Sequence, residues 1–105
     1  EADSFSLVWQ NFAFEPSAFT LAEKLSPWLI SDYSSSKWPR TELVGKKARV
    51  RTYQLNQHTL EILKTFNSVF DFIAPHYPED IAFYKRKTLI FSSVTHETQA
   101  WFEHP

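Results

Sequence analysis

The chain has 105 residues, enough for one domain with a core of its own but not for two. A hydrophobic fraction of 43%, an aromatic fraction of 17% and a single glycine exclude a linker or a disordered tail. The lack of cysteine excludes disulfides and thiolate metal sites, and no apolar run approaches the ~20 residues of a membrane span. We therefore expect one domain over residues 1–105, in a reducing, cytoplasmic setting and without a membrane partner.

Charge is unevenly distributed although the net charge is only -1. Residues 37–51 carry six basic residues against one acidic residue, whereas the segments before and after this block are acidic overall. The middle block is therefore the one strongly basic part of the chain.

The first half of the chain predicts a strand followed by helix. Residues 4–10 alternate apolar and polar residues, which is typical of a strand, and residues 17–33 have helical spacing. Ser26-Pro27 interrupts that spacing and indicates either a kinked helix or two short helices. Three serines, a proline and the glycine predict a loop over residues 34–45.

The second half predicts a strand, a long helix and a hairpin. Residues 46–54 alternate again, and the strongest apolar periodicity follows from Asn56 to Ile73. Residues 81–85 and 88–94 read as two strands of a hairpin that turns at Arg86-Lys87.

Thr95 is suited to cap a last short helix. The resulting order is β-α-β-α-β-β-α. We therefore expect the α+β class, with a small, mostly antiparallel sheet of about four strands and helices packed on one face.

Groups able to do acid–base chemistry gather at the two ends of the hairpin. Glu79 and Asp80 precede its first strand, and His96 and Glu97 follow its second. Because an antiparallel hairpin brings these ends together, His96 is expected beside carboxylates, where a histidine could act as a general base or bind a metal if the protein is an enzyme. The structural alternative is that Glu97 only stabilises the N-terminus of the last helix, and that Glu79 and Asp80 only mark the start of a strand.

Two other segments are candidate surfaces for a partner. The strand over residues 46–54 has one basic face, which would attract nucleic acid or an acidic protein, or would simply protect a sheet edge. Trp38 lies in the predicted loop, either as a partner anchor or as a plug over the core. The predicted partner-binding residues are Trp38, Arg40, Glu42, Arg49, Arg51, Glu79, Asp80 and Glu97.

Several classes of site are excluded by residue type or spacing. There is no Gly-x-Ser-x-Gly motif, and a lone Gly45 cannot form a glycine-rich phosphate loop. Position 100 is Ala, so His96-Glu97 does not begin a zincin motif, and the four histidines lack metal-ligand spacing. We expect no metal and no cofactor.

Three short motifs support a resemblance. They are Lys37-Trp38-Pro39-x-Thr41-Glu42-Leu43, Pro78-Glu79-Asp80 and Ser93-x-x-His96-Glu97. In these motifs, and over about residues 18–101, the chain resembles a family of small uncharacterised bacterial proteins. That family has no established activity, so the resemblance implies no catalytic residues. The chain departs from the family pattern at Arg40, where relatives have Gly, and in its basic hairpin turn.

These observations favour a non-enzymatic domain that binds another protein. A bacterial immunity protein, which inhibits a toxin by covering its active site, suits the size, the missing catalytic motif and the segregated charge. One alternative is a small enzyme that uses His96 with Glu97, Glu79 or Asp80. Another is a nucleic-acid-binding module that uses the basic strand at residues 46–51, although the near-neutral net charge argues against it.

Overall fold

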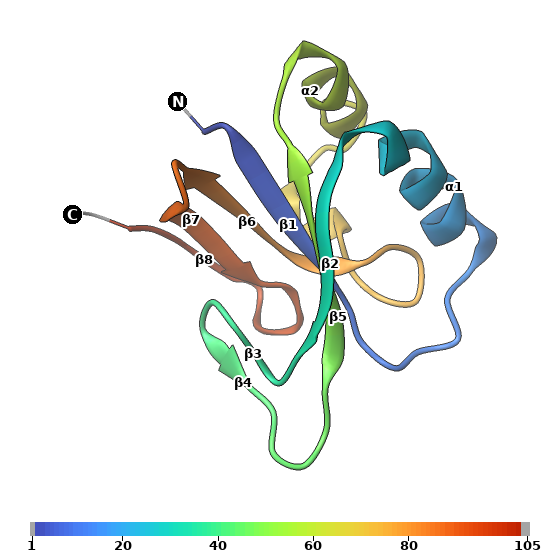
Figure 1. Ribbon diagram of the computed structural model, residues 1–105. Coiled ribbons are helices and arrows are strands. Elements are labelled where there is room, and N and C mark those ends of the chain that lie inside the picture. The colour runs from blue at the N-terminus through green and yellow to red at the C-terminus, as the bar shows by residue number, and fades with distance from the viewer. Residues whose placement is uncertain (1, 104–105) are drawn as a thin grey trace.

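The computed structural model describes residues 2–103 and has an α+β fold built on one large antiparallel sheet (Figure 1). The sheet has six strands in the order β2-β5-β1-β6-β7-β8. These strands are Ser4–Trp9 (β1), Leu29–Ser35 (β2), Ala48–Gln54 (β5), Glu79–Lys85 (β6), Thr88–Val94 (β7) and Gln99–Phe102 (β8). A separate small hairpin consists of Lys37–Trp38 (β3) and Thr41–Glu42 (β4).

The helical elements are short. The α-helices are Pro16–Leu25 (α1) and Gln57–Leu63 (α2), and the 3-10 turns are Ser26–Trp28 (η1), Val69–Asp71 (η2) and Thr95–Glu97 (η3). Asn56 and Thr59 form a capping box that begins α2, and Ser68 and Asp71 do the same for η2. Among residues 2–103, no helix has the length and apolar character needed to cross a membrane.

The main core lies between one face of the sheet and the two α-helices. Phe5 and Leu7 from β1 and Tyr53 from β5 pack against Leu21 and Leu25 of α1. Phe5 and Tyr53 stack with ring centroids 5.4 Å apart. Because successive strand residues point to opposite faces, this arrangement makes the odd-numbered residues of β1 the helix-facing set. We call this side of the sheet the helix face.

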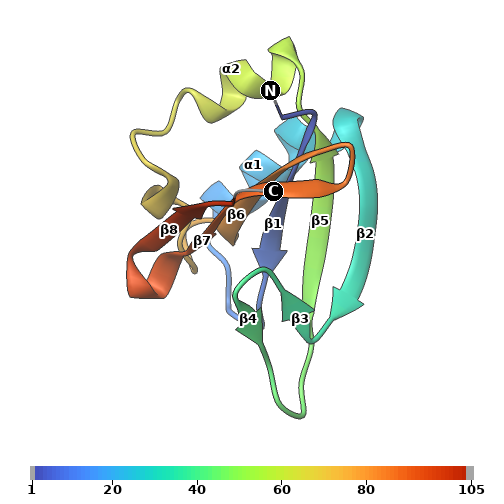
Figure 2. The ribbon, with the colours of Figure 1, turned by 90° about the vertical axis from the view of Figure 1, so that its left-hand side faces the viewer.

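The opposite side, which we call the second face, is covered only in part. Trp38 of the β3–β4 hairpin packs there against Val8, Ala48 and Val50, and its residue exposure is only 5%. In Figure 2 this hairpin lies at the lower ends of the strands β1, β5 and β2, and the tip of the β6–β7 hairpin crosses in front of β5. Register shifts in the β1–β6, β2–β5 and β6–β7 pairs mark bulges, which bend and twist strands.

The α+β class and the antiparallel sheet agree with expectation, but the strand number and order do not. The expectation of about four strands omitted β2 and β8, and it placed helix where these strands lie. α1 ends at Leu25, and Pro27 sits in the η1 turn rather than in a continuing helix. The following residues are extended because they pair with β5.

The remaining differences concern the second helix, the C-terminal segment and the expected central loop. The expected helix from Asn56 to Ile73 stops at Leu63, since Ser68 starts a new turn by accepting from the Phe70 amide. The expected last helix is one 3-10 turn, and Thr98 leaves it with φ of 52° before β8 begins. The expected loop over residues 34–45 contains the β3–β4 hairpin.

Candidate functional site

The four candidate acid–base residues lie at one end of the sheet, where β6 begins and β7 runs into η3. Glu79 and Asp80 are the first two residues of β6, and His96 and Glu97 belong to η3. The antiparallel pairing of β6 with β7 accounts for this proximity. The side chains nevertheless separate into two clusters, because successive residues of a strand point to opposite faces.

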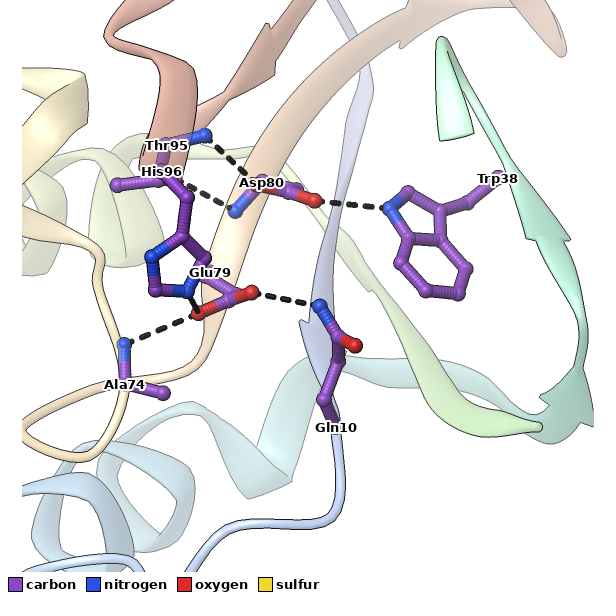
Figure 3. A network of polar contacts seen from close by, with 7 residues as sticks. All are labelled: Gln10, Trp38, Ala74, Glu79, Asp80, Thr95 and His96. Atoms are coloured by element: carbon purple, nitrogen blue, oxygen red, sulfur yellow. Dashed lines mark hydrogen bonds and ion pairs between the residues drawn. The ribbon is translucent and has the colours of Figure 1, made fainter. Parts of the chain in front are cut away.

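Glu79 forms the first cluster and is fully buried, with 0% exposure. Its Oε2 accepts a hydrogen bond of 2.7 Å from Gln10 Nε2, and its Oε1 accepts one of 3.1 Å from the Ala74 amide (Figure 3). His96 Nε2 lies 3.0 Å from the same Oε1. The nearby Ala74 amide and two side chains from distant parts of the chain therefore converge on one carboxyl group, which fits the rule that buried polar groups are hydrogen-bonded.

Asp80 forms the second cluster, on the other side of the strand. Its Oδ2 accepts 2.9 Å from Trp38 Nε1 and its Oδ1 accepts 2.8 Å from the Thr95 amide (Figure 3). The Asp80 amide in turn donates 3.0 Å to Thr95 Oγ1. Asp80 has φ of 55°, a conformation that Asp tolerates better than most residues. This side chain links the β3–β4 hairpin, β6 and η3.

His96 is the one exposed member of these clusters that could exchange protons with solvent. Its side chain is 49% exposed, and its ring stacks on Phe12 with centroids 6.2 Å apart. The contact with Glu79 fixes one ring nitrogen, an arrangement that orients an imidazole for general acid or base work. Glu97 is exposed and takes no part in either cluster.

The two clusters lie beside a groove rather than inside one, since Gln10 and Phe12, which contact Glu79 and His96, line a groove of about 620 Å³. Of the larger grooves on the described part of the chain, with volumes of about 620, 640 and 670 Å³, none is lined by Glu79 or His96 itself. Within residues 2–103, no group of three His, Asp or Glu side chains is placed to hold a metal ion. The fourth histidine, His104, lies outside the described residues.

Burial removes three of the predicted partner-binding residues from the surface. Trp38, Glu79 and Asp80 are all buried, so they cannot form the exposed contact surface expected from the sequence. Glu42 and Glu97 are exposed. Trp38 plugs the second face, which was the structural alternative for this side chain.

The predicted arginines are already engaged within the molecule. Arg40 stacks over Trp101 at 4.4 Å and pairs with Glu103 at 2.8 Å. Arg49 and Arg51 both pair with Asp32, at 2.8 Å and 3.3 Å. The basic face of β5 is therefore partly neutralised by β2, a strand that the sequence reading missed.

A groove between the loop after β1 and the loop before β5 retains free positive charge. We call it the basic groove; its volume is about 620 Å³ and its lining includes Trp9, Phe12, Leu43, Lys46, Lys47 and Arg49. No described residue forms an ion pair with Lys46 or Lys47, and Phe12 is 43% exposed. Sequence reasoning noted these lysines but missed Phe12, since a lone Phe after a strand gives no signal of exposure.

Comparison with known proteins matches no protein family, no curated relative and no solved structure, so the resemblance proposed from short motifs gains no support from it. The candidate function rests on the geometry described above.

Proposed function

We propose that the protein acts by binding another protein, and that the basic groove receives an acidic segment of that partner. The observation that carries this proposal is the combination of two lysines without an internal ion pair and a half-exposed Phe12 in one groove. Aromatic anchors contribute binding energy at interfaces, and complementary charge speeds association.

Inhibition of a bacterial toxin is the more specific role that we propose for such a domain. The charge distribution supports an acidic target surface rather than a basic nuclease cleft. Glu79 and Asp80 are buried and Asp32 is engaged by two arginines, so these acids do not form an acidic face. The lysines of the basic groove remain available for a partner.

A pull-down from a bacterial lysate with the full chain tests the proposal. We expect one stoichiometric protein to be retained by the wild type and lost with Lys46→Glu/Lys47→Glu. The matched control is Lys24→Glu/Lys64→Glu, which changes the same amount of charge on α1 and at the end of α2. Equal capture by both double variants would contradict binding through the basic groove.

The apolar part of the groove is tested separately. Phe12→Ala should weaken capture by about tenfold or more, the loss typical of an aromatic anchor. Phe102→Ala removes another exposed phenylalanine from β8 and should leave capture unchanged. If the two alanine variants behave alike, Phe12 is not an anchor.

A second candidate is a small enzyme based on His96, favoured by the 3.0 Å contact between His96 and Glu79. A panel of ester, amide and phosphoester model substrates tests it with the wild type and His96→Ala. Turnover that is lost in the variant would support the enzyme. A variant that folds normally and turns over every substrate at the wild-type rate would dismiss it.

Nucleic-acid binding is a third candidate function, and it would use the cations of β5 and of the basic groove. It predicts retention of DNA or RNA at low salt and a steep loss of affinity as salt rises. The pairing of Arg49 and Arg51 with Asp32 leaves this surface less basic than the sequence suggests. Release of the retained partner by nuclease treatment would favour nucleic acid over protein.

A further inference from the structure

A groove lies on the part of the second face that the β3–β4 hairpin does not cover, next to the turn between β6 and β7. Its volume is about 640 Å³, and its floor and walls include Ser4, Ser31, Tyr33, Thr52, Gln54 and Tyr84. These residues come from β1, β2, β5 and β6, four neighbouring strands of the sheet. We call this region the hydroxyl groove, and it does not overlap the basic groove.

The floor of the hydroxyl groove includes neutral hydrogen-bonding groups placed side by side, and the exposed Ile30 adds an apolar side chain to the same lining. Ser31 pairs with Thr52 across β2 and β5, and on its other side Thr52 pairs with Ser6 of β1, which is buried and does not line the groove. One row away, Ser4 lies between Gln54 and Tyr84. A central sheet face normally carries apolar residues where it is covered, so this row of hydroxyls indicates a surface that remains wet or meets a polar ligand.

Tyrosine rings add flat apolar surface to the groove. Tyr33 is 49% exposed on the edge strand β2. Tyr84, on β6, is more buried. A pyranose has apolar C–H faces and polar hydroxyl edges. An aromatic ring can contact the C–H face, and neighbouring hydroxyl and amide groups can hydrogen-bond to the sugar hydroxyls.

Two cationic residues at the rim of the groove, Arg86 and Lys87, have a backbone conformation that usually favours asparagine or glycine. Arg86 and Lys87 form the two-residue turn between β6 and β7, with φ of 50° and 68°. Positive φ at both positions defines a type I′ turn, for which Asn-Gly is the favoured pair. Asp3 Oδ2 accepts 2.9 Å from the Arg86 amide and fixes the turn beside the groove. A departure from local preference in a surface turn is a reason to look for function.

The geometry points to the hydroxyl groove as a binding site for a saccharide unit that carries one anionic group. The hydroxyls and Gln54 would bind the sugar hydroxyls, Tyr33 would stack on the ring, and Arg86 and Lys87 would bind the carboxylate or phosphate. Asp3 offsets one of the two cations, so the lining carries a net charge of +1. That value suits a singly charged group better than a polyanion such as single-stranded nucleic acid, which needs a more basic track.

Isothermal titration calorimetry and amide NMR with the full chain test this site. The probes are glucuronic acid, glucose 6-phosphate, neutral glucose and inorganic phosphate, with oligo(dT) as the polyanion. We expect binding of one or both acidic sugars, weaker binding of glucose and of phosphate, and shifted amides in β1, β2, β5 and β6. Glucuronic acid and glucose 6-phosphate distinguish a carboxylate from a phosphate as the anionic group.

The decisive variant is Arg86→Asn/Lys87→Gly, which removes both cations while giving the turn its favoured residues. Affinity for the acidic sugar should fall by about tenfold or more, as expected when a charged hydrogen-bonding partner is removed. Lys46→Gln/Lys47→Gln removes the same charge from the basic groove and should not change affinity.

Three results would overturn the saccharide site. They are the absence of amide shifts at millimolar acidic sugar, equal loss of affinity in both double variants, and tighter binding of oligo(dT) than of either acidic sugar. None of these results bears on partner capture by the basic groove, so the two proposals can fail separately.

Discussion

The indole nitrogen of Trp38 donates a hydrogen bond of 2.9 Å to Oδ2 of Asp80, although 42 residues separate them in the chain. Both side chains are buried. This bond ties the β3–β4 hairpin to the start of β6, and it gives Trp38 the partner that a buried indole N–H requires. The hairpin is therefore tied to the second face by a buried hydrogen bond as well as by the packing of Trp38 against Val8, Ala48 and Val50.

Trp38→Phe should destabilise the protein, because it leaves Asp80 Oδ2 buried without its donor and removes part of the ring. We expect a loss of about 1–3 kcal/mol in the free energy of unfolding, measured by urea denaturation. Trp28→Phe, in the half-buried η1 turn, is the matched control and should cost less. Equal losses in the two variants would mean that the indole–carboxylate bond contributes little.

Glu79→Gln should be more damaging than His96→Gln. Three groups converge on the Glu79 carboxyl: the Gln10 side chain, the Ala74 amide and His96. In the variant, the NH2 group of the new Gln would face one of these hydrogen-bond donors and leave it without an acceptor. Leaving a buried hydrogen-bonding group unsatisfied costs about 1–3 kcal/mol, whereas the exposed His96 ring can be replaced at little cost. Urea denaturation of the two variants measures both. A larger loss for His96→Gln would show that the histidine, not the carboxylate, organises this end of the sheet.

The local pattern of the sequence was enough to predict the strands in which apolar and polar residues alternate clearly. β1, β5, β6 and β7 lie close to their expected ranges, and the turn at Arg86-Lys87 is where it was expected. β2 was missed because Leu29–Ser35 is an edge strand with mostly exposed residues, so its sequence lacks a clean apolar alternation. Its conformation comes from pairing with β5, a contact that local periodicity cannot encode.

The candidate site was predictable in position but not in side-chain direction. Hairpin pairing alone places Glu79 and His96 at one end of the sheet. Strand alternation separates Asp80 from Glu79, but its partner Trp38 belongs to the β3–β4 hairpin, which the sequence did not indicate. The open hydroxyl groove was also unpredictable, since it depends on which half of a sheet face remains uncovered.

Replacing Arg40 with glycine should have two opposite effects on stability that nearly cancel. It follows Pro39 in the turn of the β3–β4 hairpin with φ of 68°, a position that favours glycine. Arg40→Gly relieves strain of about 1–2 kcal/mol but loses the stacking on Trp101 and a partly exposed pair with Glu103, worth about 0.5–1 kcal/mol each. We expect nearly unchanged stability.

Arg40→Ala is the control for this cancellation, because it loses the same contacts and keeps most of the strain. Its unfolding midpoint in urea should lie below that of Arg40→Gly by an amount equivalent to about 1 kcal/mol. Identical midpoints for the two variants would mean that the turn stores no strain at Arg40.

Alkaline pH should weaken the fold through Tyr53. Burial raises the pKa of Tyr53 above its usual value of 10.0, an effect that the nearby Arg51 partly opposes. The folded state therefore holds this phenolic proton more tightly than the unfolded chain does. The resulting stabilisation is complete below pH 10.0 and is lost as pH rises through the folded pKa, with a slope of at most about 1.4 kcal/mol per pH unit.

Tyr53→Phe removes that titration while keeping the ring that stacks on Phe5. We expect urea denaturation to give a shallower alkaline loss of stability for the variant than for the wild type. The two proteins differ only in the Tyr53 hydroxyl, so the difference between the two curves at each pH isolates Tyr53. Parallel curves above pH 10.0 would show that the hydroxyl ionises as easily in the folded protein as in the unfolded chain, and that the packing around Phe5 and Tyr53 admits water.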